Sequence, residues 1–396
     1  MKTTRLSLEI KPFEISVAYL EHLIINRLLM NSTTTERKIQ FDKKRLTDFY
    51  PTLRKRVEEY FNTHKLSTHA NAAMVFKTIF ILGVFIASYV LVMVGFLPLW
   101  AMLAVIMVHG FFTALVGFNI SHDAVHGSYS ASARLNKILG TTFNFAGTSD
   151  YIWKIKHNIV HHTFTNIPEH DDDIDQIGLI RIEQTRDLKW YHRFQHFYVF
   201  ILYCFTTIVW VFVNDYKNFF RKSWGYYENN KHPRGAFLRI ISYKAIYYFC
   251  YLVLPFLVLN IAWYWIVFGF VMMHAIQGLT LAIVFQLAHV VEGAEFPKPD
   301  ENDKVENNWA VHQLYTTVDF AQRSSLVRFL VGGLNFQVEH HLFPKICHIH
   351  YKKIAPIVRQ TAQEFNLPYL ENKTFGGALL SHIRLMKSLG RKEALA

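Results

Sequence analysis

Two long stretches of the chain carry no charged side chain. Residues 78–122 and 245–291 contain no Asp, Glu, Lys or Arg over 45 and 47 residues. A helix crosses the roughly 30 Å core of a bilayer with about 20 apolar residues, so each stretch is long enough for two helices. Each also has an uncharged turn at its middle, Gly95–Trp100 in the first and Leu259–Trp265 in the second. The pattern predicts two transmembrane hairpins, with spans at about 76–96, 100–120, 241–260 and 264–288.

The net charge is concentrated at the two ends of the chain. Residues 1–77 hold 14 Lys or Arg against 8 Asp or Glu, and residues 342–396 hold 9 against 3. Each end is therefore +6, and together they account for the formal net charge of +12. Basic segments beside apolar spans follow the positive-inside rule, which predicts that both termini face the cytoplasm. The same distribution argues against nucleic acid as the partner of the basic residues.

A third uncharged stretch lies between Phe194 and Asn214. Its apolar core, residues 197–213, is about 17 residues long and stands at the lower limit for a span. A span here would put the polar regions before and after it on opposite faces of the membrane. We therefore predict an interfacial helix at about 197–213, with an additional span as the alternative.

The segments that flank the membrane region are basic. They are predicted to cover residues 1–74 and 366–396, around a membrane domain at 75–365. Within the first segment, apolar residues recur at helical spacing with Arg and Lys between them; these residues are Tyr50, Leu53, Val57 and Phe61. The spacing indicates an amphipathic helix that either lies on anionic lipid or packs on the rest of the protein.

Histidine is unusually frequent, with 21 residues, whereas the chain has only three cysteines and no C-x-x-C motif. A thiolate site is therefore not expected, and a bound metal would depend on imidazole, which suits Zn, Cu, Fe and Ni. Three groups of histidines follow apolar segments: His122-Asp123-Ala124-Val125-His126, His157-Asn158-Ile159-Val160-His161-His162 and Gln337-Val338-Glu339-His340-His341.

Helical geometry predicts how these groups point. Residues i and i+4 share a face of an α-helix, so His157 and His161 should lie together, with His162 turned about 100° away. The predicted topology brings all three groups to the same membrane face. Their seven imidazoles are too many for one ion and suit two.

The three groups, in this order, resemble the three histidine boxes of the membrane fatty acid desaturase family. The residues after the second box, His162–Ile167 and His170–Ile174, are also similar to that family. The run Gly332–Pro344, which contains the third box, is similar to the front-end branch of the family. The resemblance covers roughly residues 75–365.

The resemblance implies an all-α integral membrane fold, in which four spans support a cytoplasmic helical cap with a di-iron centre. It implies that the two irons use O2 and two electrons to introduce a double bond into an acyl chain. The matching ligands are His122, His126, His157, His161, His162, His340 and His341, with His289 as an additional ligand from the end of the last span. Gln337 replaces the first histidine of the third box, either as a ligand or to orient a neighbour.

Other residues are candidates for supporting roles. His312, Asp123 and His170 are expected as ligands or as partners of ligands. Carboxylates are needed to orient metal-bound imidazoles, and Asp171, Asp172, Asp173 and Glu339 are candidates besides Asp123. The acyl chain is expected in an apolar slot between the spans, beneath the irons.

The family resemblance also predicts the partners. Many front-end desaturases carry an amino-terminal cytochrome b5 domain, and this sequence has no His-Pro-Gly-Gly motif. Electrons are therefore expected from a separate ferredoxin or cytochrome b5-type protein, as in a bacterial inner-membrane enzyme. The substrate is expected to be an acyl-CoA or an acyl-lipid, desaturated as by a linoleoyl-CoA or delta-6-like enzyme. A hydroxylase on the same scaffold and, from another class, a transition-metal transporter are the alternatives.

Overall fold

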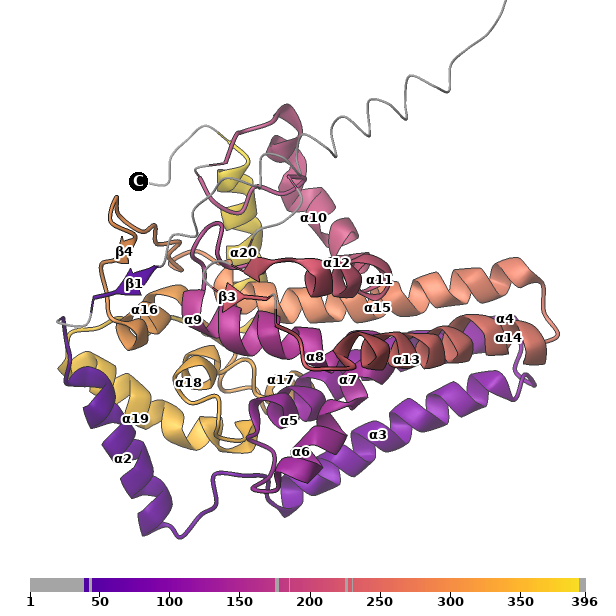
Figure 1. Ribbon diagram of the computed structural model, residues 1–396, viewed down its shortest axis with the longest axis horizontal. Coiled ribbons are helices and arrows are strands. Elements are labelled where there is room, and N and C mark those ends of the chain that lie inside the picture. Colours follow the sequence, from indigo (N-terminus) through magenta and orange to yellow (C-terminus); the bar gives the residue numbers. More distant parts are fainter. Residues whose placement is uncertain are drawn as a thin grey trace, which may run out of the picture. The chain divides into compact units, whose positions relative to one another are not determined.

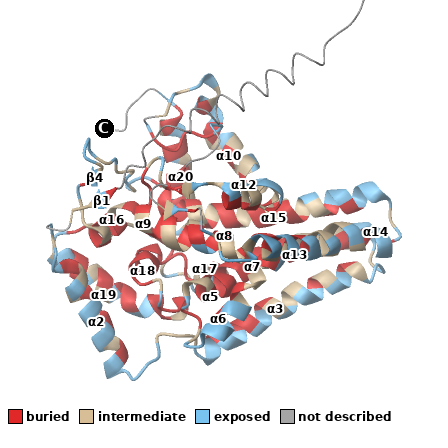
Figure 2. Ribbon diagram, in the orientation of Figure 1, coloured by how far each residue is buried: buried red, intermediate tan, exposed pale blue. Residues whose placement is uncertain are grey.

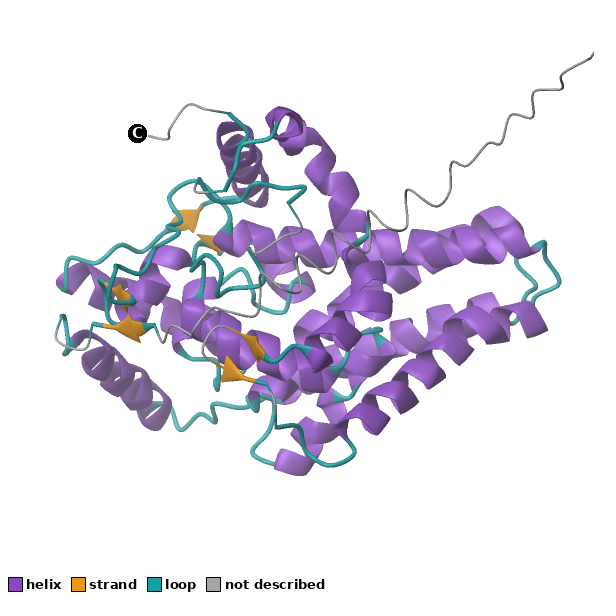
Figure 3. Ribbon diagram, turned by 45° about the horizontal axis from the view of Figure 1, so that its top comes forward, coloured by secondary structure: helices purple, strands orange, loops and turns teal. Residues whose placement is uncertain are grey.

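The computed structural model describes residues 39–42, 45–174, 178–184, 186–224, 227–229 and 231–391. These residues are mainly helical, and their six strands are only two residues long (Figure 3). The strands pair as β1 (Gln40–Phe41) with β4 (Lys304–Val305), β2 (Ser223–Trp224) with β3 (Tyr227–Glu228), and β5 (Asp319–Phe320) with β6 (Glu371–Asn372). The first 38 residues of the predicted basic amino-terminal segment lie outside the described residues.

Four helices of the described residues are long and apolar enough to cross a membrane. They are Ala72–Met93, Leu99–His126, Ala236–Val258 and Trp263–His289. The first is α3 and the last is α15; the second comprises α4 (Leu99–Val116), η1 (Gly117–Ser121) and α5 (His122–His126), and the third comprises α13 (Ala236–Tyr248), η5 (Phe249–Val253) and α14 (Leu254–Val258). The protein is therefore an all-α integral membrane protein, in which these helices run side by side (Figure 1).

The four helices present apolar side chains both to one another and outward. Only 22–44% of the residues in their apolar segments are buried inside the protein. The rest are the tan and pale blue parts of these helices in Figure 2. Phe76, Phe96 and Trp100 are examples of exposed aromatic residues. A helix that is apolar on all sides is stable when lipid covers its outer face.

Local sequence determines where these helices begin and end. The side chain of Asn71 accepts a hydrogen bond from the backbone N–H of Met74 and caps the start of α3. Pro98 precedes α4, where its fixed φ and missing N–H cost nothing. At the other end, Gly127 adopts a left-handed conformation (φ 75°) and ends α5 directly after His126.

The uncharged stretch at 194–214 forms a bent helix pair. One part runs from Trp190 to Cys204 and the other from Thr206 to Phe220, with a bend of 54° between them. The parts comprise η3 (Trp190–Phe194), α10 (Gln195–Cys204), α11 (Thr206–Val209), η4 (Trp210–Asn214) and α12 (Asp215–Phe220). Such a pair is either a broken span or a re-entrant segment, so an interfacial position of 197–213 stays a prediction.

The remaining helices form a cap at one end of the spans (Figure 1). They are α2 (Phe49–Thr63), α6 (Ala133–Gly140), α7 (Thr142–Phe145), α8 (Asp150–Trp153), η2 (Lys154–His161), α9 (His162–Phe164), α16 (Trp309–Thr316), α17 (Ser325–Leu330), α18 (Gln337–Leu342), η6 (His348–His350), α19 (Tyr351–Glu364) and α20 (Phe375–Leu389). The apolar face of α2 is buried in a cluster with α16, α18 and α19. Of the two interpretations of this amphipathic face, packing on the protein is the one observed.

Candidate metal centre

Five structural elements bring the three histidine groups and His289 together. The first group lies on α5, at the end of the second span, and His289 is the last residue of α15. The second group lies on η2 and α9, and the third on α18 in the cap. At a rise of about 1.5 Å per residue, α15 and the helix that ends in α5 are each about 40 Å long, longer than the roughly 30 Å hydrocarbon core. Their ends can therefore carry histidines beyond it.

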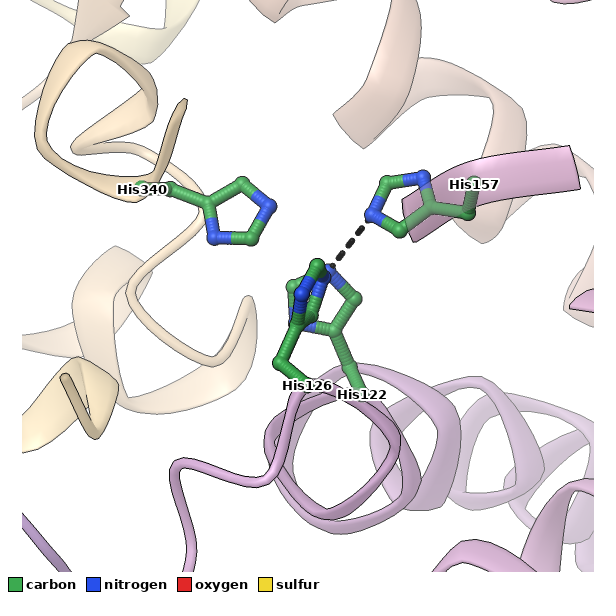
Figure 4. Close-up of side chains that lie close together, drawn as sticks. All are labelled: His122, His126, His157 and His340. Atoms are coloured by element: carbon green, nitrogen blue, oxygen red, sulfur yellow. Dashed lines mark hydrogen bonds between the residues drawn. The ribbon is translucent and has the colours of Figure 1, made fainter. Parts of the chain in front are cut away.

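Four of the histidines form one compact group. His122, His126, His157 and His340 each offer a ring nitrogen, and these nitrogens all lie within 4.8 Å of one another. Figure 4 shows the four rings pointing toward a common centre from α5, η2 and α18. The Nε2 atoms of His122 and His157 are 3.0 Å apart.

A second group forms beside the first. His161, His289 and His341 also bring ring nitrogens within 4.8 Å of one another. The side-chain amide of Gln337 lies among them, with its Nε2 atom 2.9 Å from Nε2 of His289 and 3.2 Å from Nε2 of His341. A half-turn of this amide exchanges its nitrogen for its oxygen, which is the atom that can bind a metal.

His162 lies between the two groups, contrary to the expectation that it would point away. Its ring centroid is 4.6 Å from that of His340 and 4.3 Å from that of His341. The cause is the backbone, because Lys154–His161 is a π-helix rather than an α-helix. With i→i+5 hydrogen bonding, His157 and His162 share a face, and their rings are 4.8 Å apart.

Several ring nitrogens of these histidines have no hydrogen-bond partner in the protein, so the group is suited to binding metal ions. Within the described part of the chain, Nε2 has no hydrogen-bond partner in any of four buried or half-buried histidines: His126, His161, His162 and His340. Burying a polar atom without a partner costs free energy, and such atoms in a native protein require an explanation. Converging imidazole nitrogens with free lone pairs are the donor set of a transition metal.

The opposite ring nitrogens are held by the surrounding protein. Nδ1 of His161 lies 2.9 Å from a carboxylate oxygen of Asp171, and Nδ1 of His341 lies 2.8 Å from the amide oxygen of Gln313. Nδ1 of His289 and Nδ1 of His340 contact the carbonyl oxygen of Thr316 (3.1 Å) and the hydroxyl of Tyr351 (3.2 Å), respectively. When Nδ1–H donates to an oxygen, Nε2 is left as the electron-pair donor.

The pKa values agree with neutral donors. Burial, followed by repulsion from the neighbouring imidazoles, lowers the pKa of each of His157, His162, His340 and His341 well below its ordinary value. Burial also opposes protonation of His161, but the Asp171 carboxylate outweighs it and raises the pKa of this ring. Burial therefore keeps the other four rings uncharged, which is the form that binds metal.

Only part of the predicted aspartate run reaches the cluster. Asp171 orients His161, and Asp173 lies 3.4 Å from the same ring nitrogen while it pairs with Lys156 at 2.7 Å. Asp172 instead binds the guanidinium of Arg221 and the indole N–H of Trp224. From the sequence alone, these three adjacent aspartates are equally good candidates for orienting a metal-binding imidazole.

Three other candidates also lie outside the groups. The nearest carboxylate oxygen of Asp123 is 4.0 Å from Nδ1 of His122, and Asp123 accepts from His348 instead. A ring nitrogen of His312 bonds to the carbonyl of Thr165. His170 contacts the carbonyl of Pro168.

Glu339 is turned away from the rings as well. Its side chain is fully buried, and its carboxyl accepts a hydrogen bond from Tyr369 beside Asp319. Burial, together with the neighbouring Asp319, raises the pKa of Glu339 well above its usual range.

The sequence did not indicate Gln313, Thr316 or Tyr351. Gln313 and Thr316 both lie on α16, which packs against the third box, and Tyr351 begins α19. Neutral hydrogen-bonding residues are common throughout the chain, so no sequence spacing distinguishes these three residues from the others of the same types. The one available signal is their position in polar sequence on either side of the third box.

A narrow apolar slot leads away from the first group between α4 and α15. His122 lines the end of the slot at the first group. One side of the slot is lined by Gly117 and Thr113 of the second span. The other side is lined by Phe285, Leu281 and Gln277 of α15. Trp153 and Trp210 close its sides. Most of this lining is apolar, as in pockets that bind apolar ligands.

These observations define an integral membrane protein whose spans end in a buried centre of eight histidines, above an apolar slot. Comparison with known proteins agrees with this class. The family of fatty acid desaturases matches residues 98–373. The chain belongs to the fatty acid desaturase family, whose members are metal-dependent, and it is an enzyme of the oxidoreductase class.

Several curated proteins are similar over most of their length. The sn-1 linoleoyl-lipid 6-desaturase of Arthrospira platensis is 37% identical over 360 residues, which is 90% of this chain and 96% of that protein. The sn-1 linoleoyl-lipid 6-desaturase of Synechocystis sp. is 34% identical, covering 90% and 99%. The acyl-lipid (8-3)-desaturase of Physcomitrium patens is 37% identical, covering 87% and 72%.

Proposed function

We propose that the centre binds two iron ions and that the enzyme uses them, with O2, to desaturate the acyl chain of a membrane lipid. The proposed ligands are His122, His126, His157, His161, His162, His289, His340 and His341, with Gln337 beside the second ion. The observation that carries the proposal is the convergence of partnerless buried Nε2 atoms from all three boxes.

The two irons would supply the oxidant for an unactivated methylene pair, which no side chain can provide. The overall change balances as follows: the chain loses two hydrogens, and these, with two electrons and two protons from outside, reduce O2 to two waters. The protein's own part is to position and to exclude water. Asp171, Gln313 and Tyr351 keep the imidazoles oriented, and the apolar slot that His122 lines would receive the acyl chain.

The substrate we propose is an acyl-lipid, with the new double bond on the carboxyl side of an existing one. Of the relatives described above, two are named sn-1 linoleoyl-lipid 6-desaturases and one is named an acyl-lipid (8-3)-desaturase. Gln337, which replaces the first histidine of the third box, supports the front-end position. Its amide contacts His289 and His341, which supports a place for Gln337 beside the second ion.

Electrons are proposed to come from a separate ferredoxin or cytochrome b5-type protein on the cytoplasmic face. The basic segments that flank the spans support this orientation through the positive-inside rule. We propose that the metal centre faces the same side, since it lies where the second and fourth spans end and the cap begins.

The test is expression in a host that makes defined unsaturated lipids, followed by chromatography and mass analysis of the acyl chains. A product two mass units lighter than its precursor, with the new double bond toward the carboxyl end, is expected. A product sixteen units heavier would mean hydroxylation instead. The purified protein should contain about two irons per chain, and chelation should abolish activity in parallel with iron loss.

The His161→Ala variant completes this test. It should retain membrane insertion but lose desaturation, because one of three imidazoles of the second group is gone. Full activity in this variant would contradict the proposed ligand set.

A further inference from the structure

A charged side chain is buried inside the first span. Lys77 is the only charged residue of α3, and it is 4% exposed. A lysine near the end of a span usually extends its ammonium group to the membrane surface, and a buried one requires a partner. Ionisable residues inside spans commonly serve function. None of the proposed metal ligands lies on α3, so a functional role of Lys77 has to act through other residues.

A series of hydrogen bonds leads from Lys77 to the first histidine box. The ammonium of Lys77, which can only donate, lies with Nζ 3.1 Å from Nε2 of His348. The opposite nitrogen, Nδ1 of His348, then donates to the carboxylate of Asp123 at 2.8 Å. The thiol of Cys347 donates to the same carboxylate oxygen at 3.0 Å. All four side chains are buried, so the ammonium compensates the carboxylate through a neutral imidazole. We call these four residues the Lys77 cluster.

The hydrogen bonds of the Lys77 cluster distinguish it from the metal centre. Asp123, Cys347 and His348 bring possible ligand atoms within 4.8 Å of one another, as the metal-binding groups do. However, both ring nitrogens of His348 have a partner, and Lys77 already provides a positive charge. In the metal centre Nε2 of His161 has no partner. The Lys77 cluster is therefore suited to holding segments of the chain together.

The segments that it holds are the first and the third histidine box. Asp123 directly follows His122 of the first box, whereas Cys347 and His348 lie just after the third box. The loop before the third box also contacts His348, because a Cβ on Gly333 would lie 2.7 Å from the Cβ of His348. His348 thus lies between the carboxylate of the first box and the backbone that leads into the third.

The two groups of the metal centre depend differently on this connection. One group combines residues of the first and the third box (Figure 4); its members are His122, His126, His157 and His340. The other group has no residue of the first box; its members are His161, His289 and His341. A shift of the first box relative to the third would therefore disturb the first group and leave the second in place.

We propose that Lys77 is a positioning residue for the first metal ion. Through His348 it holds Asp123, and with Asp123 the first box, at the distance from His340 that the first group requires. This inference rests on the proposed two-iron centre and goes beyond it, because it assigns a role to a span that carries no proposed ligand. It also requires that the two irons respond differently to the loss of Lys77.

The first experiment measures the affinity of each iron. Lys77→Met removes the ammonium but keeps an unbranched side chain, so the buried carboxylate of Asp123 loses its compensating charge. The dissociation constant of one iron should rise about 10- to 100-fold, as for other residues that support ligands, and that of the other iron should not change. Chelator competition on the purified full-length enzyme, followed by elemental analysis, measures both constants.

His109→Asn is the matched control. Nδ1 of His109 on α4 contacts the hydroxyl of Ser88 on α3, so this residue joins the same two spans. It lies 13 residues before His122 in the sequence, or about 20 Å along a helix. The variant should lower thermal stability and leave both iron affinities unchanged. Equal weakening of both irons in Lys77→Met, or selective loss of one iron in His109→Asn, would overturn the proposal, because either result indicates a general effect on stability.

The second experiment requires no iron. Cys347 is fully buried, whereas Cys204 and Cys250 are half-buried and provide internal references. In iron-free protein, a maleimide should label Cys347 at least about tenfold faster in Lys77→Met than in the unaltered chain, because the segment after the third box opens locally. Labelling of Cys204 and Cys250 should not change. Full protection of Cys347 in Lys77→Met would overturn the proposal.

The two experiments also separate this inference from the proposed function. If the unaltered protein bound no iron, the proposed function would fail. The labelling of Cys347 would still show whether Lys77 holds the third box to the first.

Discussion

The described part of the chain contains two kinds of buried histidine, and their difference separates structural residues from ligands. His109 and His274 lie inside the spans, where each is hydrogen-bonded through both ring nitrogens. The hydroxyl partners are Ser88 and Tyr251 for His109, and Thr207 and Tyr247 for His274. In the metal centre, by contrast, Nδ1 of a ring such as His161 has a partner and Nε2 has none. Burial is common to both kinds, so the feature that marks the ligands is the convergence of several partnerless ring nitrogens on one place.

The largest effect expected from this comparison is at His162, which lies between the two groups of the centre. His162→Ala should reduce desaturation by more than about 100-fold, beyond the loss typical for residues that merely support ligands. It should also lower the iron content, since this ring is close to His340 on one side and His341 on the other. Activity from product chromatography and iron from elemental analysis are the measurements. Two irons per chain with normal activity would show that His162 is not a ligand.

The four long apolar helices could be predicted from the sequence, because they depend on composition over long windows. The absence of charge over residues 78–122 and 245–291 is enough to indicate four long apolar helices. The direction of His162 could not be predicted, because it depends on a π-helix that tertiary packing imposes on Lys154–His161. The sequence also gives no sign that residues 375–389 of the basic tail form a helix packed on α10 and α15.

Supporting residues are harder still to predict, because a carboxylate is selected by its orientation and not by its type. Asp171 and Asp172 are adjacent, yet one holds His161 and the other pairs with Arg221. The loop geometry that separates them depends on contacts with distant segments. One such contact is Asn166, whose side-chain amide donates to the carbonyl of His289 and whose backbone N–H donates to Asp171.

The second prediction uses this adjacent pair. Asp171→Asn should lower activity about 10- to 100-fold, because the neutral amide holds the His161 ring less firmly and supplies less electron density to it. Asp172→Asn is the matched control and should change activity little, although it weakens the contact with Arg221. Turnover under saturating lipid and the iron content of both variants give the comparison. Equal losses in the two variants would mean that the whole run acts only through loop structure.

A smaller effect is expected at Tyr351, whose hydroxyl lies 3.2 Å from Nδ1 of His340. Tyr351→Phe removes one neutral hydrogen bond, worth about 0.5–1.5 kcal/mol, and keeps the buried ring in place. Activity should therefore fall roughly two- to tenfold, with iron still bound but its optical spectrum shifted. A loss as large as that of His162→Ala would place Tyr351 in the coordination of the metal itself.

The smallest effect on activity is expected at His274, where the comparison began. His274→Asn leaves a side chain that can satisfy only one of the two hydroxyls of Thr207 and Tyr247, so a buried polar group loses its partner. This should cost about 1–3 kcal/mol of stability. Iron content and the activity of the folded fraction should stay within about twofold, because neither ring nitrogen of His274 faces the centre. Thermal unfolding in detergent measures the first effect, and turnover per iron measures the second. Loss of iron from His274→Asn would contradict the rule that a fully hydrogen-bonded histidine is structural, and with it the reason for excluding the span histidines from the site.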